Sequence, residues 1–122
     1  MANTHTVSAS VQFSDGTDGY GINLNPVTST QGAPAIAHGV VTIGTSEETL
    51  SIGDVAAGGL FVFKNRGPTN FIEIGPDNGG TLLPFVKCAA DKFGQIPGLS
   101  STTIKAKADT APCVLEYWLF NA

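Results

Sequence analysis

Apolar and polar residues alternate along two stretches of this chain. In residues 7–14 every second position is apolar, and the positions between hold serine or glutamine. Residues 103–109 repeat the pattern, with threonine, lysine and aspartate around Ile104 and two alanines. A period of two is typical of a β-strand with one face toward solvent. The sequence therefore predicts a half-exposed strand in each stretch.

Clusters of Gly, Pro, Asn and Asp separate these stretches from other short apolar runs, and such clusters mark turns. No window of about ten residues has helical spacing without an interruption by Gly, Pro or a β-branched residue. We predict an all-β chain of about eight or nine short strands with little helix, in an antiparallel β-sandwich that is jelly-roll-like. The strands are expected at residues 7–14, 20–24, 35–43, 49–52, 60–63, 71–74, 82–88, 103–109 and 114–120.

Turn and proline positions refine this prediction. Residues 60–63 and 71–74 flank a polar segment and are expected to pair as a hairpin. Residues 76–80 predict a second tight turn, because their Asn-Gly pair accepts the positive φ values that short hairpin loops require. Pro84 lies within an expected strand, so that strand should lie at a sheet edge or contain a bulge. The last strand, residues 114–120, is apolar on both faces, which suits burial against a partner or a central place in a sheet.

The length of 122 residues allows one domain, and 42% hydrophobic residues are enough for a core. We expect residues 1–6 to form a flexible N-terminal arm and residues 7–122 to form a single β-sandwich domain. The first residues have neither the basic nor the apolar part of a signal peptide, and no apolar run reaches the roughly 18 residues of a membrane span. The protein is therefore expected to stay in the cytoplasm where it is made, with Cys88 and Cys113 as free, buried thiols.

The charge is sparse, acidic and unevenly placed. The formal net charge of −4 argues against a nucleic-acid partner, because binding to phosphates requires clustered Lys and Arg. All six basic residues lie between Lys64 and Lys107, whereas the first 63 residues hold only acidic charges. Charged residues make up 13% of the chain, against a usual fraction of about 25%. This indicates a surface that other protein subunits partly cover, and we expect no nucleic acid and no membrane partner.

No motif in the sequence predicts an active site or a metal centre. The histidines, His5 and His38, lie far apart in the sequence, and no nucleophile motif surrounds a serine. The segment Asp15–Gly19 lacks the alternating ligands of a calcium loop, and we interpret it as a turn. Glu73 and Glu116 could form a glycosidase pair, but ordinary exposure on strands explains them better. We expect no enzyme activity, no cofactor and no metal.

From about residue 38 to its end, the sequence resembles small virion proteins of tailed bacteriophages. The resemblance rests on residues 60–75, in which an apolar strand, a Lys-Asn turn, a Thr-Asn pair and a strand ending in Ile-Gly follow one another. The stretch 94–98 departs from the pattern of that family, in which an acidic Gly-Glu pair is common before an apolar strand. Four other segments continue the resemblance, namely residues 42–50, 84–87, 104–111 and 114–117.

The resemblance implies a β-sandwich virion component, and an acidic domain of this size is most like a capsid decoration, or cement, protein. Such a protein would form a homotrimer on the outer surface of the capsid. It would stabilise the shell by binding between subunits of the major capsid protein. An N-terminal arm that contacts a partner would include Asn3, Thr4, His5 and Thr6.

Two other functions remain open. One is a tail or adaptor component of the same virion, which ring-like symmetry would distinguish from a decoration trimer. The other belongs to a different class, a jelly-roll carbohydrate-binding module, because aromatic side chains stack on sugar rings. The aromatic candidates for that role are Tyr20, Tyr117 and Trp118.

Overall fold

The computed structural model describes residues 4–14, 16–17, 19–30, 35–101 and 103–122, and of residues 5, 13, 20, 27, 29 and 30 it describes only the backbone. The chain divides into two compact units, Met1–Gly32 and Ala33–Ala122. The first unit holds one sheet and the second holds two. All regular structure in the described residues is β-strand, which confirms the predicted all-β class.

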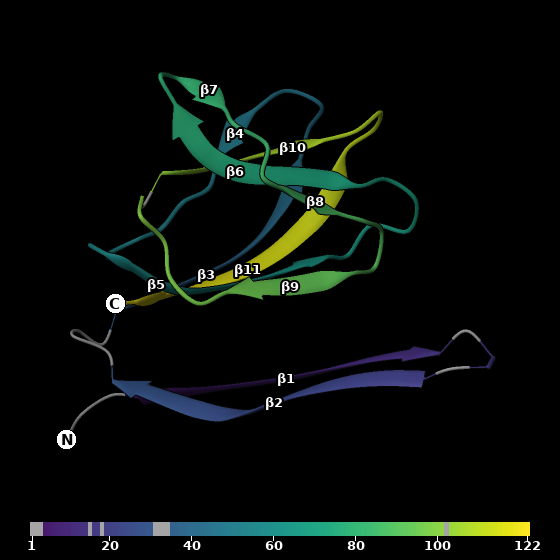
Figure 1. Cartoon of the computed structure of the whole chain (residues 1–122). Coiled ribbons are helices and arrows are strands. Elements are labelled where there is room, and N and C mark those ends of the chain that lie inside the picture. The colour runs from purple at the N-terminus through teal and green to yellow at the C-terminus, as the bar shows by residue number, and fades with distance from the viewer. Residues whose placement is uncertain (1–3, 15, 18, 31–34, 102) are drawn as a thin grey trace. The chain divides into compact units, whose positions relative to one another are not determined.

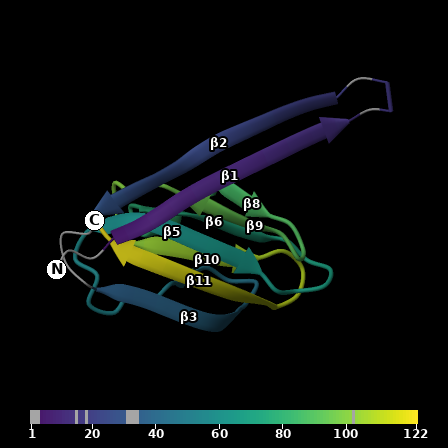
Figure 2. The ribbon, with the colours of Figure 1, turned by 90° about the horizontal axis from the view of Figure 1, so that it is seen from below.

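The first unit is a single antiparallel hairpin. In it, β1 (Thr4–Ser14) pairs with β2 (Gly19–Thr30), and the two strands run side by side in Figure 2. The register places Ala9 opposite Leu24 and Val11 opposite Ile22, so apolar residues of both strands share one face. Two strands provide no second layer within the unit to cover that face.

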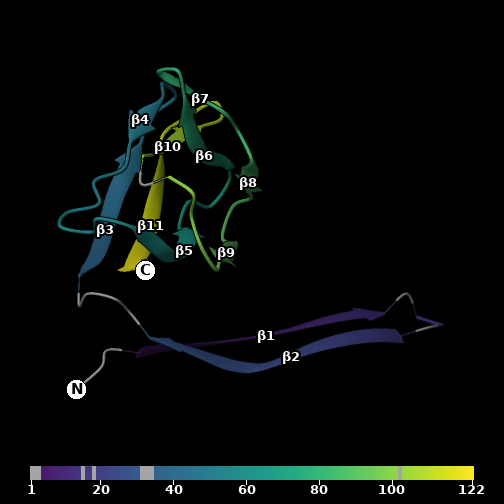
Figure 3. The same ribbon diagram turned by 60° about the vertical axis from the view of Figure 1, so that its left-hand side comes forward.

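The described residues of the second unit form nine strands. They are β3 (Ile36–Ile43), β4 (Glu48–Thr49), β5 (Gly58–Asn65), β6 (Ile72–Asn78), β7 (Thr81–Leu82), β8 (Val86–Cys88), β9 (Phe93–Ile96), β10 (Ile104–Ala108) and β11 (Cys113–Asn121). One sheet has the order β3-β11-β5-β9. The other has the order β4-β10-β6, with β7 and β8 both paired to β6. Figures 1 and 3 show these sheets as the two layers of a sandwich.

Four antiparallel strand pairs of this unit are nested like the two arms of one long hairpin. β3 pairs with β11, β4 with β10, β5 with β9, and β6 with β8. Successive pairs alternate between the two sheets. A long hairpin wrapped in this way around a two-layer core is the jelly-roll strand order. The predicted sandwich is thus confirmed, with eleven described strands in the two units in place of the expected eight or nine.

Alternate residues of β11 form the centre of the core. Leu115 and Leu119 are fully buried, and Ile72 and Ile74 of the facing sheet belong to the same apolar cluster. Tyr117 lies over Gly39 of β3, where a Cβ would come within 2.7 Å of the phenol ring. The Tyr117 hydroxyl donates a hydrogen bond to the carbonyl of Ser51 at 2.6 Å. Because Gly39 has no side chain, the Tyr117 ring fits over β3 and its hydroxyl, the only polar atom of the side chain, reaches the Ser51 carbonyl.

The tight turn predicted within residues 76–80 is present, but its loop is Gly79-Gly80 and not the expected Asn78-Gly79 pair, because Asn78 is the last residue of β6. Gly79 and Gly80 connect β6 to β7 with φ values of 64° and 92°. Two successive positive φ values are characteristic of a type I′ hairpin loop. Pro84 lies in the break between β7 and β8, at the edge of its sheet, where no ladder partner requires an N–H donor.

Other predictions of strand pairing are wrong. β5 and β6 do not form a hairpin, because they belong to different sheets: β5 pairs with β9 and β11, and β6 pairs with β7, β8 and β10. β9 was not expected from the sequence, and β2 continues to Thr30 where a loop from Pro26 was expected. Strand pairing in a jelly roll joins residues that are far apart in the sequence, so local apolar runs do not reveal it.

The N-terminal boundary also lies elsewhere than expected. Residues 1–6 were predicted to be a flexible arm, but Thr4, His5 and Thr6 belong to β1 and pair with Thr30, Ser29 and Thr28. The division between compact units falls between Gly32 and Ala33. The sandwich consequently begins at β3, and the preceding 30 or so residues form a unit of their own.

Candidate interaction surface

The sheet β3-β11-β5-β9 has a solvent-side surface that we call the outer face. It consists of the alternate positions opposite those that enter the core. The register aligns His38, Trp118 and Val62 in one row across three strands, and Val40, Glu116 and Lys64 in the next. The remaining members of the outer face are Ile36, Thr42, Phe93, Gln95, Val114 and Phe120.

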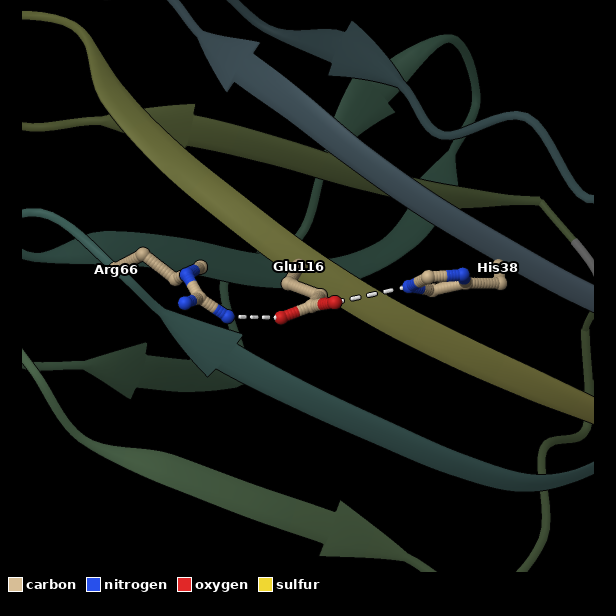
Figure 4. A network of polar contacts seen from close by, with 3 residues as sticks. All are labelled: His38, Arg66 and Glu116. Carbon is tan, nitrogen blue, oxygen red and sulfur yellow. Dashed lines mark hydrogen bonds and ion pairs between the residues drawn. The ribbon is translucent and has the colours of Figure 1, made fainter.

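A three-residue ionic network crosses this face (Figure 4). One oxygen of the Glu116 carboxylate lies 2.9 Å from His38 Nε2, and the other pairs with Arg66 Nη1. The hydrogen bond from His38 lowers the pKa of the Glu116 carboxyl, partial burial opposes the shift, and Arg66 adds to the lowering. Both carboxylate oxygens are thus held by cationic or hydrogen-bonding partners, and the network ties β3, β11 and the segment after β5 together.

The indole of Trp118 lies beside this network. The His38 ring stacks on it, with centroids 5.0 Å apart and planes inclined by 6°. Val62 flanks Trp118 on the neighbouring strand. One face of the indole is therefore covered by His38, which leaves less of the ring open for stacking on a ligand.

Apolar residues surround the network on the same face. Ile36 and Val40 of β3 are 54% and 60% exposed, and Phe93 of β9 is also exposed. The β11 residues Val114 and Trp118 are half-buried. Clustered apolar residues at the surface of a folded sheet are typical of a protein–protein contact. The outer face thus combines an apolar surface with a few fixed charges.

An apolar groove of about 280 Å³ opens between the two sheets. Its inner wall includes Phe61, Ile74 and Ile104, and the exposed side chains of Leu83 and Phe85 line its mouth. Ser100 and Ser101 supply polar groups, and none of the described residues that line it is charged. The groove can accept an apolar group, but it offers little that would orient a polar ligand.

Among the described residues, His38 and the Glu73–Glu116 pair do not form the catalytic arrangements considered from the sequence. The partners of His38 are a carboxylate and an indole ring, neither of which is a nucleophile that a histidine activates. Glu73 and Glu116 belong to different sheets and lie at positions that alternate with buried ones, so they point to opposite outer surfaces of the sandwich. No group of three metal-ligating side chains occurs among the residues that the structure describes.

Both cysteines are buried and free, as expected. Burial raises the pKa of the Cys88 thiol, and a hydrogen bond from the backbone of Asn65 partly offsets the shift. The thiol itself donates to the carbonyl of Lys92 at 3.3 Å. A protonated, enclosed thiol is a poor nucleophile, which suits a structural role.

Three of the four residues predicted for a partner-contacting arm belong to strand β1. Asn3 lies outside the described residues, and Thr4 and His5 are backbone-paired in β1. The Thr6 and Thr28 hydroxyls form a cross-strand hydrogen bond of 2.8 Å. Of the aromatic residues proposed for sugar binding, Tyr117 is buried, Trp118 lies on the outer face, and the side chain of Tyr20 lies outside the described part.

Sequence reasoning missed the outer face as a unit. It identified β11 as apolar on both faces, but it could not show that Ile36, Val40 and Arg66 lie beside it. The signal that could have been used is the alternation in residues 36–42, where isoleucine, histidine, valine and threonine occupy one face.

No protein family, curated protein or solved structure matched this chain in comparisons of its sequence and fold. In the part of the chain that the structure covers, no helix is long and apolar enough to cross a bilayer.

Proposed function

We propose that this protein is a structural subunit of a tailed-bacteriophage virion, acting as a capsid decoration protein that binds between subunits of the major capsid protein. The sequence resemblance of residues 38–122 supports this role, and so does the low charge of the chain. The observation that carries the proposal is the outer face, where Ile36 and Val40 are exposed on a folded sheet. Such a surface is suited to a protein partner, and neither the face nor the groove presents a reactive constellation.

The action of such a subunit is mechanical. Each copy that bridges neighbouring capsid subunits buries apolar surface, which contributes about 25 cal/mol per Å² before the cost of association. We propose that the protein acts as a homotrimer on the outer surface of the shell. Several copies bound together gain avidity, because the second and third contacts form within an already bound complex.

The test is binding to shells assembled from the major capsid protein encoded in the same genome. The full chain is mixed with the shells, the shells are sedimented, and the bound protein is quantified. We expect a fixed ratio of protein to shell at saturation and a higher temperature of shell disruption. Protein that remains in the supernatant at micromolar concentration contradicts the decoration role. Binding to tail structures instead supports the tail or adaptor alternative.

A carbohydrate-binding function is the alternative from another class. Trp118 favours it, because the indole lies on the same face of β11 as Glu116, two positions away, and Glu116 and its partner Arg66 carry groups that could hydrogen-bond to sugar hydroxyls. The stacking of His38 on the indole weakens it. Trp118 is the single tryptophan of the chain, so a change of its fluorescence on titration with sugars would indicate this function directly.

A further inference from the structure

The β1–β2 hairpin presents an apolar face that its own unit does not cover. Val11 and Leu24 are 59% and 58% exposed, and Ile22 is exposed opposite Val11. The opposite face is polar, because Ser10 pairs with Asn23 and Gln12 pairs with Gly21. An isolated two-stranded hairpin is at best marginally stable in water. The hairpin therefore needs an apolar surface of about its own length to pack against.

We propose that the β1–β2 hairpin of one copy packs its apolar face on the outer face of a second copy of this chain. The inference specifies the self-association that the proposed function invokes, and it rests on that part of the proposed function. The outer face is the complementary surface, since Ile36 and Val40 are exposed on it. Packing one twisted sheet on another is the ordinary way in which β-sandwiches bury such faces.

The dimensions of the two surfaces agree. The 11 residues of β1 span about 36 Å, and the nine residues of β11 span about 30 Å, at roughly 3.3 Å per residue. A hairpin of that length and about 10 Å width buries on the order of 700 Å² when both partners are counted. In a closed dimer the contact occurs twice between the same two copies, so the pair buries about 1,400 Å², which is above the roughly 1,200 Å² of stable interfaces.

The charges of the two surfaces are complementary. Residues 1–32 contain Asp15 and Asp18 but no lysine or arginine. On the outer face and at its margin, Lys64 and Arg66 are basic, and Glu116 is already paired with His38 and Arg66. Among the described residues of this face and its margin, the two basic side chains of Lys64 and Arg66 outnumber the single carboxylate of Glu116, so an acidic hairpin is attracted to it. Unlike charges favour this docking over that of two outer faces or of two hairpins.

The connection between the units favours exchange between copies. Only five residues separate Thr30 at the end of β2 from Ile36 at the start of β3, and Pro34 is one of them. Proline fixes its own φ and restricts the residue before it, so the connection has little conformational freedom. Short connections of this kind promote the exchange of an element between identical subunits.

The experiment measures the mass of the full chain by light scattering over a range of concentrations. The wild-type protein is expected to be a multiple of the 12.5 kDa chain. Leu24→Asp on the hairpin and Val40→Asp on the outer face are each expected to weaken association at least tenfold. Leu83→Asp is the control, because Leu83 is 51% exposed in the segment between β7 and β8, away from the outer face; it should leave the mass unchanged.

A mixture of the two variants separates this arrangement from others. The hairpin of the Val40→Asp protein is intact, and so is the outer face of the Leu24→Asp protein, so the mixture should form a species of two chains. A monomeric wild type, or a single variant that keeps the wild-type mass, overturns the proposal. Ile22→Asp and Ile36→Asp replace any variant whose urea unfolding shows a lost fold.

The outcome of the self-association test does not depend on the outcome of the shell-binding test. A protein that self-associates through the hairpin but does not sediment with shells retains the inference and contradicts the decoration role. A protein that is monomeric in solution but saturates shells contradicts the inference and retains that role.

Discussion

The carbonyl of Leu83 lies directly against Gly75, so that a Cβ at position 75 would overlap the carbonyl oxygen. The segment between β7 and β8 is held there by two hydrogen bonds, from the N–H of Leu83 to the carbonyl of Pro76 at 3.0 Å and from the N–H of Phe85 to the carbonyl of Ile74 at 3.1 Å. Gly75 thus lets the chain cross the edge of its sheet and form the mouth of the apolar groove.

Replacement of this glycine should destabilise the sandwich. In Gly75→Ala the methyl group has to displace backbone atoms, which cannot rotate away as a side chain can, so we expect a loss of about 3 kcal/mol in the free energy of unfolding. Urea unfolding measures the change. Gly98→Ala is the control, because a Cβ at position 98 meets no atom within 4 Å. Equal stabilities of the two variants would contradict the close approach.

The side chain of Asn65 holds three parts of the backbone together by hydrogen bonds. Its amide nitrogen donates to the carbonyls of Asn70 and Cys88 at 2.8 and 3.0 Å, and its oxygen accepts from the N–H of Gly67 at 2.8 Å. The side chain is fully buried. Asn65→Leu keeps a similar volume but removes the hydrogen bonds that Asn65 makes to these three groups, so we expect a loss of roughly 2–4 kcal/mol in the free energy of unfolding.

The control for this change is Gln95→Leu, since Gln95 is exposed on β9. Both free energies come from urea unfolding at neutral pH. A loss at Asn65 no larger than that at Gln95 would show that water replaces the missing hydrogen bonds.

The ionic network on the outer face predicts a dependence of stability on pH. The pKa of Glu116 is lowered by folding, so its contribution is fully present above the unfolded value of about 4.3 and is lost as the pH falls through the folded value. The difference in urea midpoint between the wild type and Glu116→Gln should therefore be largest near neutral pH and decrease below about pH 4.

The same comparison in a His38→Ala background identifies the cause of the shift. The hydrogen bond from His38 is its largest source, so the effect of Glu116→Gln should become smaller without His38. An unchanged effect would assign the shift to Arg66 instead. Both proteins of the His38→Ala background lack the stacking contact with Trp118, so its loss cancels when the effect of Glu116→Gln is taken within that background.

The buried thiols predict slow chemical modification. Because burial raises the pKa of Cys88 and both cysteines are enclosed, alkylation by iodoacetamide at pH 8 should be roughly 100-fold slower in the folded protein than for free glutathione. Peptide mass spectrometry locates the modified residue. Both thiols should react readily in urea. Rapid modification of Cys88 in the folded state would mean that the segment after β8 opens easily.

The sequence predicted correctly those strands in which apolar and polar residues alternate regularly. The alternation at residues 103–109 corresponds to β10, and that of residues 114–120 lies within β11, because side chains of a half-buried strand alternate between core and solvent whatever the strand pairs with. The Gly79 and Pro84 predictions succeeded for the same reason: backbone φ and the missing N–H are properties of single residues.

The pairing of β5, the existence of β9 and the outer face required the tertiary structure. Residues 60–63 and 71–74 look like a hairpin, but their apolar residues are better buried by placing them in opposite layers. The sequence of β9 gives only a weak strand signal, because the strand contains Gly94. The Phe63 ring occupies the space that a side chain at position 94 would need. The neighbourhood of Glu116, His38 and Arg66 joins residues up to 78 positions apart.

The sequence by itself thus determined that this protein is an all-β chain with an acidic, sparsely charged surface, because period, turn chemistry and charge are written in neighbouring residues. Only the tertiary structure decided that the first 30 or so residues form a separate hairpin, which strands pair in the sandwich, and which apolar residues reach its surface. Those features depend on which distant segments pack together and exclude water, and that packing is a property of the whole folded chain.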